Sequence, residues 1–353
     1  MFRLPGRFVG AAPHGNGHIN DTFIVATQAD AGPARSILQR VNDRVFRNVP
    51  ALMENLSRVT RHIGDHAPSR VRAPQPIPTR AGALWHQDAE GAYWRSFAFV
   101  DRATAHDRLA DPRHAFEVAR GFGLFQHALV DLPGPRLHET IPGFHDTRRR
   151  FEALRRAIAQ DSAGRAAACP GEIAFAMDRE ALCDVLLDLL AAGALPERVA
   201  HNDAKPNNAL LDDASGRCVC VIDLDTVMPG TALFDFGDLV RSATNAADED
   251  ERDLSLVSMR MEIFDGLARG YASASRSFLT GTERAHLAFV GKLITYENGL
   301  RFLADHLEGD VYYKIRRPSH NLDRCRNQFA LVRSIEEQEP AMQAAVDRAF
   351  ARD

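Results

Sequence analysis

The first hundred residues alternate between short apolar runs and turn-forming residues. Strand-like runs occupy residues 22–26, 36–41 and 93–100, separated by segments that contain glycine, proline, asparagine or aspartate. Between the second and third runs, residues 49–63 carry apolar side chains at positions 52, 56, 59 and 63. Steps of four, three and four residues place these side chains on one face of a helix. This part of the chain is therefore predicted to form a small sheet with one helix packed on it.

Beyond residue 100 the apolar spacing is mainly helical. The segments with this spacing are 114–130, 179–192, 254–275 and 284–305. One interruption, at residues 199–225, consists of a short apolar piece, a polar loop, and strand-like runs at 208–211 and 218–222. Pro206 disfavours a helix through the polar loop, because proline lacks an N–H donor and clashes with the preceding turn. The interruption is predicted to be a β-hairpin inside a helical part of the molecule.

The composition limits the possible partners. The chain has 353 residues, 45% of them hydrophobic and 25% charged, which fits two lobes or domains. A formal net charge of −4 predicts no nucleic-acid partner and no anionic membrane surface. The sequence has neither an apolar run of about 18 residues nor the pattern of a secretory leader. We therefore expect a cytoplasmic protein with a small-molecule partner. A monomer is favoured, with the oligomeric state left open.

The five cysteines agree with a reducing compartment. Their number is odd, and no CxxC pair occurs. Cys218 and Cys220 alternate within an apolar run, so both side chains point to one face of the predicted strand. Buried thiols in the core are predicted there, rather than a metal site.

The polar loop contains side chains that suit phosphoryl transfer. Residues 201–208 read HNDAKPNN, and the second strand of the predicted hairpin is followed by Asp223. The hairpin is expected to bring Asp203, Lys205, Asn208 and Asp223 together at one end, because its second strand returns to where the first began. Transfer from a nucleotide needs a carboxylate for the attacking hydroxyl, a cation beside the transferred group and oxygen ligands for Mg²⁺. Taken singly, an aspartate that caps a turn and an asparagine that begins a strand would look the same.

Residues 201–208 resemble the H-R-D-x-K-P-x-N loop of protein kinases. They resemble more closely the H-G-D-x-x-x-x-N loop of the aminoglycoside phosphotransferase and choline kinase superfamily. Further segments are similar to those of bacterial N-acetylhexosamine 1-kinases: 16–23, 37–42, 222–230, 233–238 and 300–313. The resemblance implies an α+β, bilobal, protein-kinase-like fold. Residues 1–100 would form a small sheet lobe that binds nucleotide, and residues 101–353 a larger, mainly helical lobe with the catalytic and acceptor sites.

The resemblance also implies roles for the polar residues of the hairpin. Asp203 would be the catalytic base or orienting carboxylate for the acceptor hydroxyl, and Lys205 would neutralise charge on the γ-phosphoryl group of ATP. Asn208 and Asp223 would be the Mg²⁺ ligands. The DFG sequence that begins at Asp235 lies beyond the hairpin, so the metal is assigned to Asp223. Asp235 is expected to support the loop by accepting its backbone N–H groups.

The nucleotide site is expected in the N-terminal lobe. A loop before the first predicted strand would let backbone N–H groups approach the phosphates. This loop comprises Gly15, Asn16, Gly17 and His18. The strand that supplies a lysine in the wider superfamily reads ILQRV at residues 37–41. Either Gln39 or Arg40 is therefore expected to replace that lysine, and the two point to opposite faces of the strand. Glu54 is the candidate partner for the missing lysine, and Val100 lies in the segment that resembles the adenine-binding hinge.

The acceptor site is expected in the C-terminal region from about residue 290, whose charged and aromatic side chains suit a sugar: Glu297, Arg301, Asp305, Asp310, Tyr312 and Tyr313. The resemblance favours contact of Arg301 with the substrate, together with Asp203. Asp225 is a candidate for a substrate hydroxyl or a second metal, with a capping or solvated carboxylate as the alternative. Glu297, Arg301 and Asp305 share one helix face, so a solvated face with salt bridges is the alternative for them. The resemblance implies transfer of the ATP γ-phosphoryl group to the anomeric hydroxyl of GlcNAc or GalNAc.

Two other functions stay open on the sequence alone. A kinase of the same fold could phosphorylate another hydroxyl compound, such as a hexose, an aminoglycoside, choline or homoserine. The arginines and tyrosines of residues 301–317 disfavour a cationic acceptor. The chain could also be a catalytically silent, kinase-like binding protein. The missing strand lysine favours this alternative, whereas the joint presence of the four polar hairpin residues disfavours it.

Overall fold

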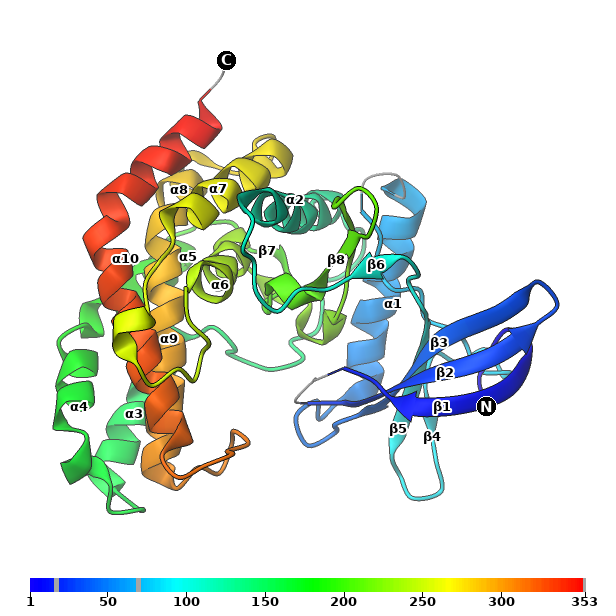
Figure 1. Cartoon of the computed structure of the whole chain (residues 1–353), viewed down its shortest axis with the longest axis horizontal. Coiled ribbons are helices and arrows are strands. Elements are labelled where there is room, and N and C mark those ends of the chain that lie inside the picture. Colours follow the sequence, from blue (N-terminus) through cyan, green and yellow to red (C-terminus); the bar gives the residue numbers. More distant parts are fainter. Residues whose placement is uncertain (16–18, 68–70, 352–353) are drawn as a thin grey trace.

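The N-terminal part of the protein is built on an antiparallel sheet. The computed structural model describes residues 1–15, 19–67 and 71–351. In this part of the chain the sheet has the strand order β1-β2-β3-β5-β4 and lies at the right of Figure 1. The strands are β1 (Arg7–Pro13), β2 (Asp21–Ala29), β3 (Gly32–Val41), β4 (His86–Gln87) and β5 (Tyr93–Ala98). The predicted runs at 22–26 and 36–41 fall within β2 and β3, and the run at 93–100 begins with β5.

Strand β3 lies between β2 and β5, which determines the neighbours of its side chains. Gln39 is opposite Thr22 of β2 and opposite Arg95 of β5. Side chains that are opposite one another on adjacent strands point to the same face of the sheet. Gln39, Thr22 and Arg95 therefore share one face, and Arg40 points to the other.

Helix α1 (Val49–His66) follows β3. Its first turn is capped by Asn48, whose side chain accepts a hydrogen bond from the backbone N–H of Ala51. The apolar face predicted from the spacing is confirmed, because its four side chains are all buried: Leu52, Leu56, Val59 and Ile63. In Figure 1, α1 lies between the sheet and the helical part of the molecule.

The remainder of the chain is mainly helical (Figure 1). Its α-helices are α2 (Pro112–Ala128), α3 (Thr147–Gln160), α4 (Pro170–Met177), α5 (Val185–Ala191), α6 (Ala232–Thr244), α7 (Met261–Ser275), α8 (Gly281–Ala285), α9 (Leu287–Glu308) and α10 (His320–Phe350). Short 3₁₀ turns occupy Ala166–Ala168, Glu180–Asp184, Pro206–Asn208, Leu224–Thr226 and Leu254–Leu256. The arrangement confirms the predicted α+β class.

Helices α2 and α7 pack at close range in this part. A Cβ atom on Gly270 would lie 2.0 Å from the carbonyl oxygen of Phe116, and one on Gly266 would lie 2.5 Å from that of Pro112. Any larger residue at either position would push the two helices apart. These two glycines therefore allow the close packing of α7 against α2.

The predicted hairpin is present inside the helical part. Strands β8 (Ala209–Asp212) and β9 (Cys218–Val221) pair antiparallel, and β6 (Ala103–Thr104) adds to the β8 edge. A second pair, β7 (Arg198–Ala200) with β10 (Met228–Gly230), brackets the hairpin in the sequence. The polar loop therefore begins and ends in hydrogen-bonded strands.

Several predicted helices have different limits in the structure. The segment 254–275 is α-helical only from Met261, because Asn245 and Met259 form a β-bridge and the Arg260 N–H donates to the Thr244 carbonyl. The segment 179–192 divides into a 3₁₀ turn and the short helix α5. The apolar spacing also missed several elements, among them β1, α3, α4, α6 and α10.

Burial agrees with the prediction for the thiols. All five cysteines are free and buried, and burial raises the pKa of both Cys218 and Cys220 to about 12. They are core side chains, as predicted. Among the described helices, none has the length and apolarity required to cross a bilayer.

Candidate active site

The polar loop, residues 201–208, connects β7 to β8 and is fixed at its start. His201 is fully buried, and its ring lies edge-on to Phe122 and Phe125 of α2 with centroid distances of 5.2 and 5.8 Å. Its Nε2 atom is 2.9 Å from the carbonyl oxygen of Ile222, directly after β9. We call residues 201–208 the catalytic loop below. His201 therefore joins this loop both to α2 and to the far strand of the hairpin.

Asp235, in the first turn of α6, holds the backbone of the catalytic loop. Its carboxylate accepts the N–H groups of His201 at 2.9 Å and Asn202 at 2.7 Å, and the side-chain amide of Gln126 at 2.6 Å. Burial raises the pKa of Asp235, although these donors favour its charged form. The prediction that Asp235 accepts backbone N–H bonds from the loop is confirmed.

Replacing Asp235 by alanine is expected to reduce stability and activity together, because three N–H donors would lose their acceptor inside the protein. Each unpaired buried donor costs about 1–3 kcal/mol, so the free energy of unfolding should fall by several kcal/mol. The kcat should fall by about ten-fold or more, since the loop would no longer be fixed. Denaturant unfolding and steady-state kinetics measure the two effects. The exposed Asp188→Ala variant on α5 is the control. Unchanged stability in Asp235→Ala would contradict the anchoring role.

Asp203 and Lys205 form an ion pair on the loop. The Lys205 Nζ atom lies 3.0 Å from Oδ1 of Asp203, and the two side chains are 34% and 26% exposed. Burial acts to raise the pKa of Asp203, but the charges of Lys205 and His201 outweigh it and lower this pKa below its ordinary value. Burial likewise opposes the charge on Lys205, yet Asp203 and Asp238 raise its pKa. Both groups are therefore charged near neutral pH, and both remain accessible to a ligand.

Asn208 and Asp223 meet at the end of the hairpin, as predicted. The Ile222 N–H donates to the Asn208 carbonyl oxygen at 2.9 Å. Asp223 has a φ of +60°, in the left-handed region that aspartate tolerates better than most residues, and it is exposed. The pKa of Asp223 is raised to about 6. The main cause is the removal of water from its carboxylate by the surrounding protein, and the negative charges of Asp225 and Asp203 add to it. This end of the hairpin therefore concentrates negative charge.

The oxygen atoms at this end suit a divalent cation. The Asn208 amide nitrogen donates to the Asp203 carbonyl at 2.9 Å and to its Oδ2 at 3.2 Å, which leaves the amide oxygen as a potential ligand. A cation would also relieve the repulsion that raises the pKa of Asp223. Among the described residues, no three histidine, cysteine, aspartate or glutamate side chains form a metal site by themselves. Asn208 and Asp223 would therefore hold Mg²⁺ together with phosphate oxygens and water, as Mg²⁺ usually requires. Their role as ligands stays a prediction.

The loop predicted to contact the phosphates is described only in part. Asn16, Gly17 and His18 lie outside the described residues. Gly15 has a φ of +76°, which glycine adopts without the strain that a side chain would cause. The contact of these four residues with nucleotide stays a prediction, as does that of Val100, which follows β5 and is half-buried.

The two candidates for the strand cation lie in different environments. Arg40 is exposed, and its Nε donates to Asp21 at 2.8 Å. Gln39 is half-buried; its Nε2 donates to the Thr22 hydroxyl at 3.0 Å, and its Oε1 accepts from Arg95 Nε at 3.0 Å. Either contact with nucleotide stays a prediction, but Gln39 is the residue that adjoins a buried cation.

Arg95 was not identified as a site residue from the sequence. It is only 1% exposed, and its Nη1 lies 3.9 Å from the Met53 sulfur on α1. Glu54, the candidate partner of a cation on β3, instead has its carboxylate 3.0 Å from the His138 ring nitrogen. The only signal for Arg95 is an arginine in the middle of an otherwise mostly apolar and aromatic strand, β5.

Asp225 lies between the hairpin and the N-terminal sheet. Its Oδ2 accepts from Asn20 Nδ2 at 2.7 Å, and its Oδ1 is 2.5 Å from Arg95 Nη1. Each carboxylate oxygen thus has a partner from the N-terminal part of the chain. The contact of Asp225 with substrate stays a prediction, and a solvated carboxylate is excluded because its side chain is buried.

The face of α9 that carries Arg301 is not a solvated row of salt bridges. Glu297 is fully buried, and its carboxylate lies 2.9 Å from His145 Nδ1, while His145 Nε2 lies 3.0 Å from the Asn202 carbonyl oxygen. Asp305 accepts the backbone N–H groups of Tyr312 and Tyr313 at 2.7 and 3.0 Å. The helix therefore supports the catalytic loop on one side and the segment after α9 on the other.

Arg301 lies between these two supports. Its guanidinium carbon is 5.4 Å from the centre of the Phe144 ring and 5.6 Å from that of Tyr313. Burial and the nearby charge of Arg301 lower the pKa of Arg150. Two arginines and aromatic faces thus occur around Phe144, whose neighbour His145 contacts the catalytic loop. The contact of Arg301 with substrate stays a prediction.

The family of the protein follows from its sequence as a whole. The model of a family described as "Phosphotransferase enzyme family" matches residues 10–278, a span that contains the catalytic loop, Asp223 and Asp235. The chain belongs to the phosphotransferase enzyme family. The predicted resemblance to the aminoglycoside phosphotransferase superfamily is thereby confirmed.

Solved structures similar to this phosphotransferase agree on its fold. A microcompartment-associated aminopropanol kinase is 15% identical, with 95% of this chain and 93% of that one covered and a TM-score of 0.60. A choline kinase from Cryptosporidium parvum Iowa II is 13% identical over 97% and 93% of the chains, with a TM-score of 0.57. A spectinomycin phosphotransferase in complex with ADP and spectinomycin is 12% identical over 95% and 92%, with a TM-score of 0.56. The predicted kinase-like fold is confirmed, while the boundary between lobes at residue 100 stays a prediction.

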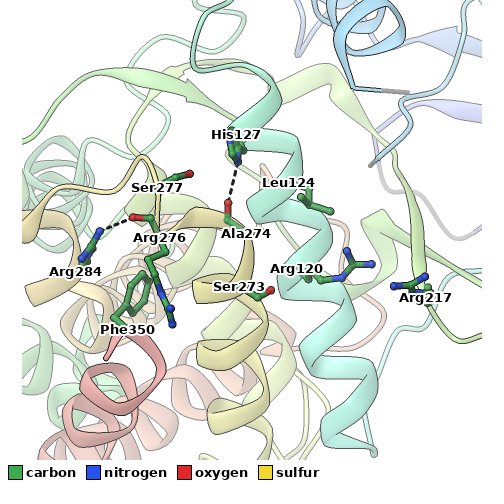
Figure 2. Close-up of a pocket in the computed structure, with 10 residues that line it drawn as sticks. All are labelled: Arg120, Leu124, His127, Arg217, Ser273, Ala274, Arg276, Ser277, Arg284 and Phe350. Atoms are coloured by element: carbon green, nitrogen blue, oxygen red, sulfur yellow. Dashed lines mark hydrogen bonds between the residues drawn. The ribbon is translucent and has the colours of Figure 1, made fainter. Parts of the chain in front are cut away.

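A groove of about 720 Å³ lies elsewhere on the phosphotransferase, between α2, α7 and the end of α10. Figure 2 shows its lining, which includes Arg120, Arg276, Arg284 and Phe350. Its lining residues do not include any of the predicted catalytic, metal or substrate residues. The groove is therefore distinct from the candidate active site.

Proposed function

We propose that this phosphotransferase transfers the γ-phosphoryl group of ATP, with Mg²⁺, to the anomeric hydroxyl of an N-acetylhexosamine, GlcNAc or GalNAc, and releases the sugar 1-phosphate. The observation that carries the transfer chemistry is the accessible Asp203–Lys205 ion pair, held beside Asn208 and Asp223 at one end of the hairpin. The choice of acceptor rests on the resemblance to N-acetylhexosamine 1-kinases and on the residues around Arg301.

Asp203 would orient the acceptor hydroxyl and take its proton late in the transfer. A lowered pKa makes Asp203 a weak base, which suits an anomeric hydroxyl, because this group is more acidic than an ordinary alcohol. Lys205 would place its positive charge beside the transferred group, where the negative charge of three oxygens must be stabilised. The same pair would thus serve both reaction partners.

Asn208 and Asp223 would hold Mg²⁺, which when bound neutralises charge on the phosphate oxygens. The chain itself contributes the rigid support of these ligands. Asn208 is fixed by its bonds to Asp203, and the Ile222 N–H fixes Asp223 relative to Asn208. Preorganised ligands lose little freedom when the nucleotide binds, which favours binding in a reactive geometry.

The charges near the acceptor side support a neutral polyhydroxyl compound. Arg301 and Arg150 are close enough for Arg301 to lower the pKa of Arg150, and a cationic acceptor such as choline would be repelled by them. A guanidinium donates hydrogen bonds to hydroxyl and acetamide oxygens, and aromatic faces such as Tyr313 cover the C–H surface of a sugar ring. The same groups give no reason to expect an aminoglycoside.

Release of ADP with a panel of acceptors tests this function. The panel contains GlcNAc, GalNAc, glucose, galactose, choline, homoserine and an aminoglycoside, each with Mg·ATP. We expect the N-acetylhexosamines to give kcat/KM values at least about ten-fold above those of the other compounds. Faster turnover of choline or the aminoglycoside would exclude the sugar assignment, and absence of turnover with every compound would favour a silent binding protein.

Replacing Arg301 by methionine is expected to weaken acceptor binding selectively. Methionine keeps much of the apolar stem but loses all five N–H donors. We expect KM for the sugar to rise by about ten-fold or more, with the affinity for Mg·ATP unchanged within about three-fold. Steady-state kinetics and calorimetry measure the two quantities, and Arg156→Met, on the exposed side of α3, is the control. An unchanged KM in Arg301→Met would remove Arg301 from the acceptor site.

A further inference from the structure

Arg95 is the most deeply buried cation of the N-terminal sheet and is bonded at both ends. Its side chain is 1% exposed. The Nε atom donates to Gln39 on the neighbouring strand at 3.0 Å, and Nη1 lies 2.5 Å from Oδ1 of Asp225. Burial of an unpaired arginine is energetically unfavourable, so Arg95 needs these two contacts to be stable in the core. Arg95 therefore connects the strand that lacks a lysine to a carboxylate 130 residues away in the sequence.

Asp225 is also bonded to the start of β2. Its second oxygen accepts from Asn20 Nδ2 at 2.7 Å, and Asn20 Oδ1 accepts the backbone N–H of Asn42 at 3.0 Å. Asn20 lies close to the end of the loop predicted to contact the phosphates. We call the four residues Asn20, Gln39, Arg95 and Asp225 the interlobe clasp. The clasp joins the residue before β2 and the strands β3 and β5 to the turn that follows β9.

That turn is the one that carries Asp223. Asp223 adopts left-handed backbone angles, φ +60° and ψ +58°, and the 3₁₀ turn Leu224–Thr226 follows directly. Such angles are unfavourable for a residue with a side chain and persist only where the surroundings enforce them. Two groups hold the turn through Asp225: the clasp holds its carboxylate, and the Thr140 hydroxyl donates to its backbone carbonyl at 2.9 Å. The direction of the Asp223 side chain thus depends on Asp225.

We propose that Arg95 is a positioning residue for phosphoryl transfer: by fixing Asp225 it holds the turn that presents Asp223, and it couples that turn to the strands beside the nucleotide. The buried ion pair lies beside Gln39 on β3, the strand that lacks the lysine of the wider superfamily. The proposal rests on the proposed binding of Mg²⁺ and nucleotide at Asn208 and Asp223. It does not depend on which acceptor is phosphorylated.

The matching of charges explains why the clasp contains an arginine. Asp225 would otherwise be a buried carboxylate beside Asp223 and Asp203, and carboxylates so close to one another repel. The planar guanidinium can form an ion pair with Asp225 through Nη1 and donate a hydrogen bond to Gln39 through Nε at once. Lysine retains the charge but has a single nitrogen atom, so it can reproduce only part of the arrangement.

The test measures nucleotide binding as a function of Mg²⁺ concentration. A non-hydrolysable ATP analogue is titrated calorimetrically into the full-length wild-type protein and the variants Arg95→Met, Arg95→Lys, Asp225→Asn and the double variant Arg95→Met/Asp225→Asn. A parallel series contains EDTA. Arg179→Met is the matched control, because it removes a partly buried arginine whose two nitrogens pair with Glu336 at 3.0 and 2.9 Å, remote in sequence from the clasp.

We expect the Mg²⁺ concentration needed for half-maximal enhancement of binding to rise by about ten-fold or more in Arg95→Met and less in Arg95→Lys. Affinity in EDTA should change by less than about three-fold, since Arg95 acts through the metal-binding turn. The double variant should be no worse than the worse single variant, because contacting residues are not additive. Arg179→Met should match the wild type.

The double variant keeps the test decisive if Arg95→Met does not fold, because it leaves no unpaired buried charge. A folded Arg95→Met, or failing that the double variant, with a Mg²⁺ requirement within about two-fold of the wild type would overturn the proposal and reduce the clasp to a structural ion pair. A wild-type protein that binds Mg·nucleotide but phosphorylates no sugar would refute only the proposed acceptor. A wild type whose nucleotide binding ignores Mg²⁺ would overturn both the metal site and the clasp.

Discussion

Replacing Asp203 by asparagine is expected to lower kcat by about 10²–10⁴-fold, the usual contribution of a proton acceptor placed at the reacting group. The amide has the same shape but cannot accept the proton, and it removes the negative charge opposite Lys205. Binding of the ATP analogue should change by less than about three-fold, since Asp203 faces the acceptor in the proposed mechanism. Steady-state ADP release and calorimetry measure the two effects.

The control for this variant is Asp188→Asn, which alters an exposed aspartate on α5. Its kcat should equal that of the wild type. If Asp203→Asn retained kcat within about ten-fold of the wild type, proton transfer to Asp203 would not contribute to the rate. The catalytic role of the Asp203–Lys205 pair would then have to be abandoned, whatever the acceptor.

Replacing Asp223 by asparagine is expected to have opposite effects on activity and on the stability of the metal-free protein. Loss of the carboxylate should reduce kcat/KM for Mg·ATP by roughly 10²–10⁴-fold, because one of the two proposed protein ligands for the metal loses its charge. The melting temperature without metal should rise slightly at pH 7.5. The pKa of about 6 shows that the ionised carboxylate is disfavoured in the folded state. The rise should be small, because Asp223 is exposed and solvent screens its charge.

The same pKa gives the direction of the pH dependence. The ordinary pKa of 3.8 is raised to about 6 in the folded protein, so the stabilisation from protonated Asp223 is complete below about pH 4 and is lost as pH rises through about 6. Metal binding needs the ionised form, so kcat/KM for Mg·ATP should increase from about pH 5 to about pH 7. In Asp223→Asn the melting temperature should lose this component of its pH dependence. An unchanged pH dependence of stability would show that Asp223 is not the group responsible.

The catalytic loop and its hairpin could be predicted because their signals are local. Pro206 disfavours a continuous α-helix, two short apolar runs flank a turn, and antiparallel pairing alone brings Asn208 next to Asp223. The supporting role of Asp235 followed from the family resemblance and from the assignment of the metal to Asp223, and the structure shows its carboxylate accepting the two N–H groups of the loop. Helix α1 likewise followed from the spacing of its buried face.

The clasp could not be predicted, because it depends on contacts between distant segments. Arg95 and Asp225 are ordinary charged residues in the sequence, and only the alignment of β5 beside β3 and the position of the turn after β9 make them partners. Arg40 and Glu54 are equally plausible in the sequence, yet they pair with Asp21 and His138 instead. Charge pairing across lobes is set by tertiary packing, which local spacing does not encode.

The environment of the α9 face that carries Arg301 could not be predicted from the sequence either. The positions of Glu297, Arg301 and Asp305 fit a solvated face equally well. The burial of Glu297 and the packing of Arg301 on Phe144 follow from α3 and from the loop before it, neither of which has an apolar pattern strong enough to be recognised: α3 contains six charged residues in TRRRFEALRRAIAQ. Once α3 is in place, His145 and Thr147 approach Glu297 at 2.9 and 2.7 Å and give it a structural role.

The position of the phosphate on the product tests the central claim most directly. The wild-type protein is incubated with Mg·ATP and GlcNAc or GalNAc, and the product is examined by ³¹P NMR and by proton–phosphorus coupling. We expect a single phosphomonoester coupled to the anomeric proton, formed by the wild type and not by Asp203→Asn at the same concentration. A phosphate coupled to any other sugar proton, or ADP formed without a sugar phosphate, would contradict the assignment of this phosphotransferase as a sugar 1-kinase.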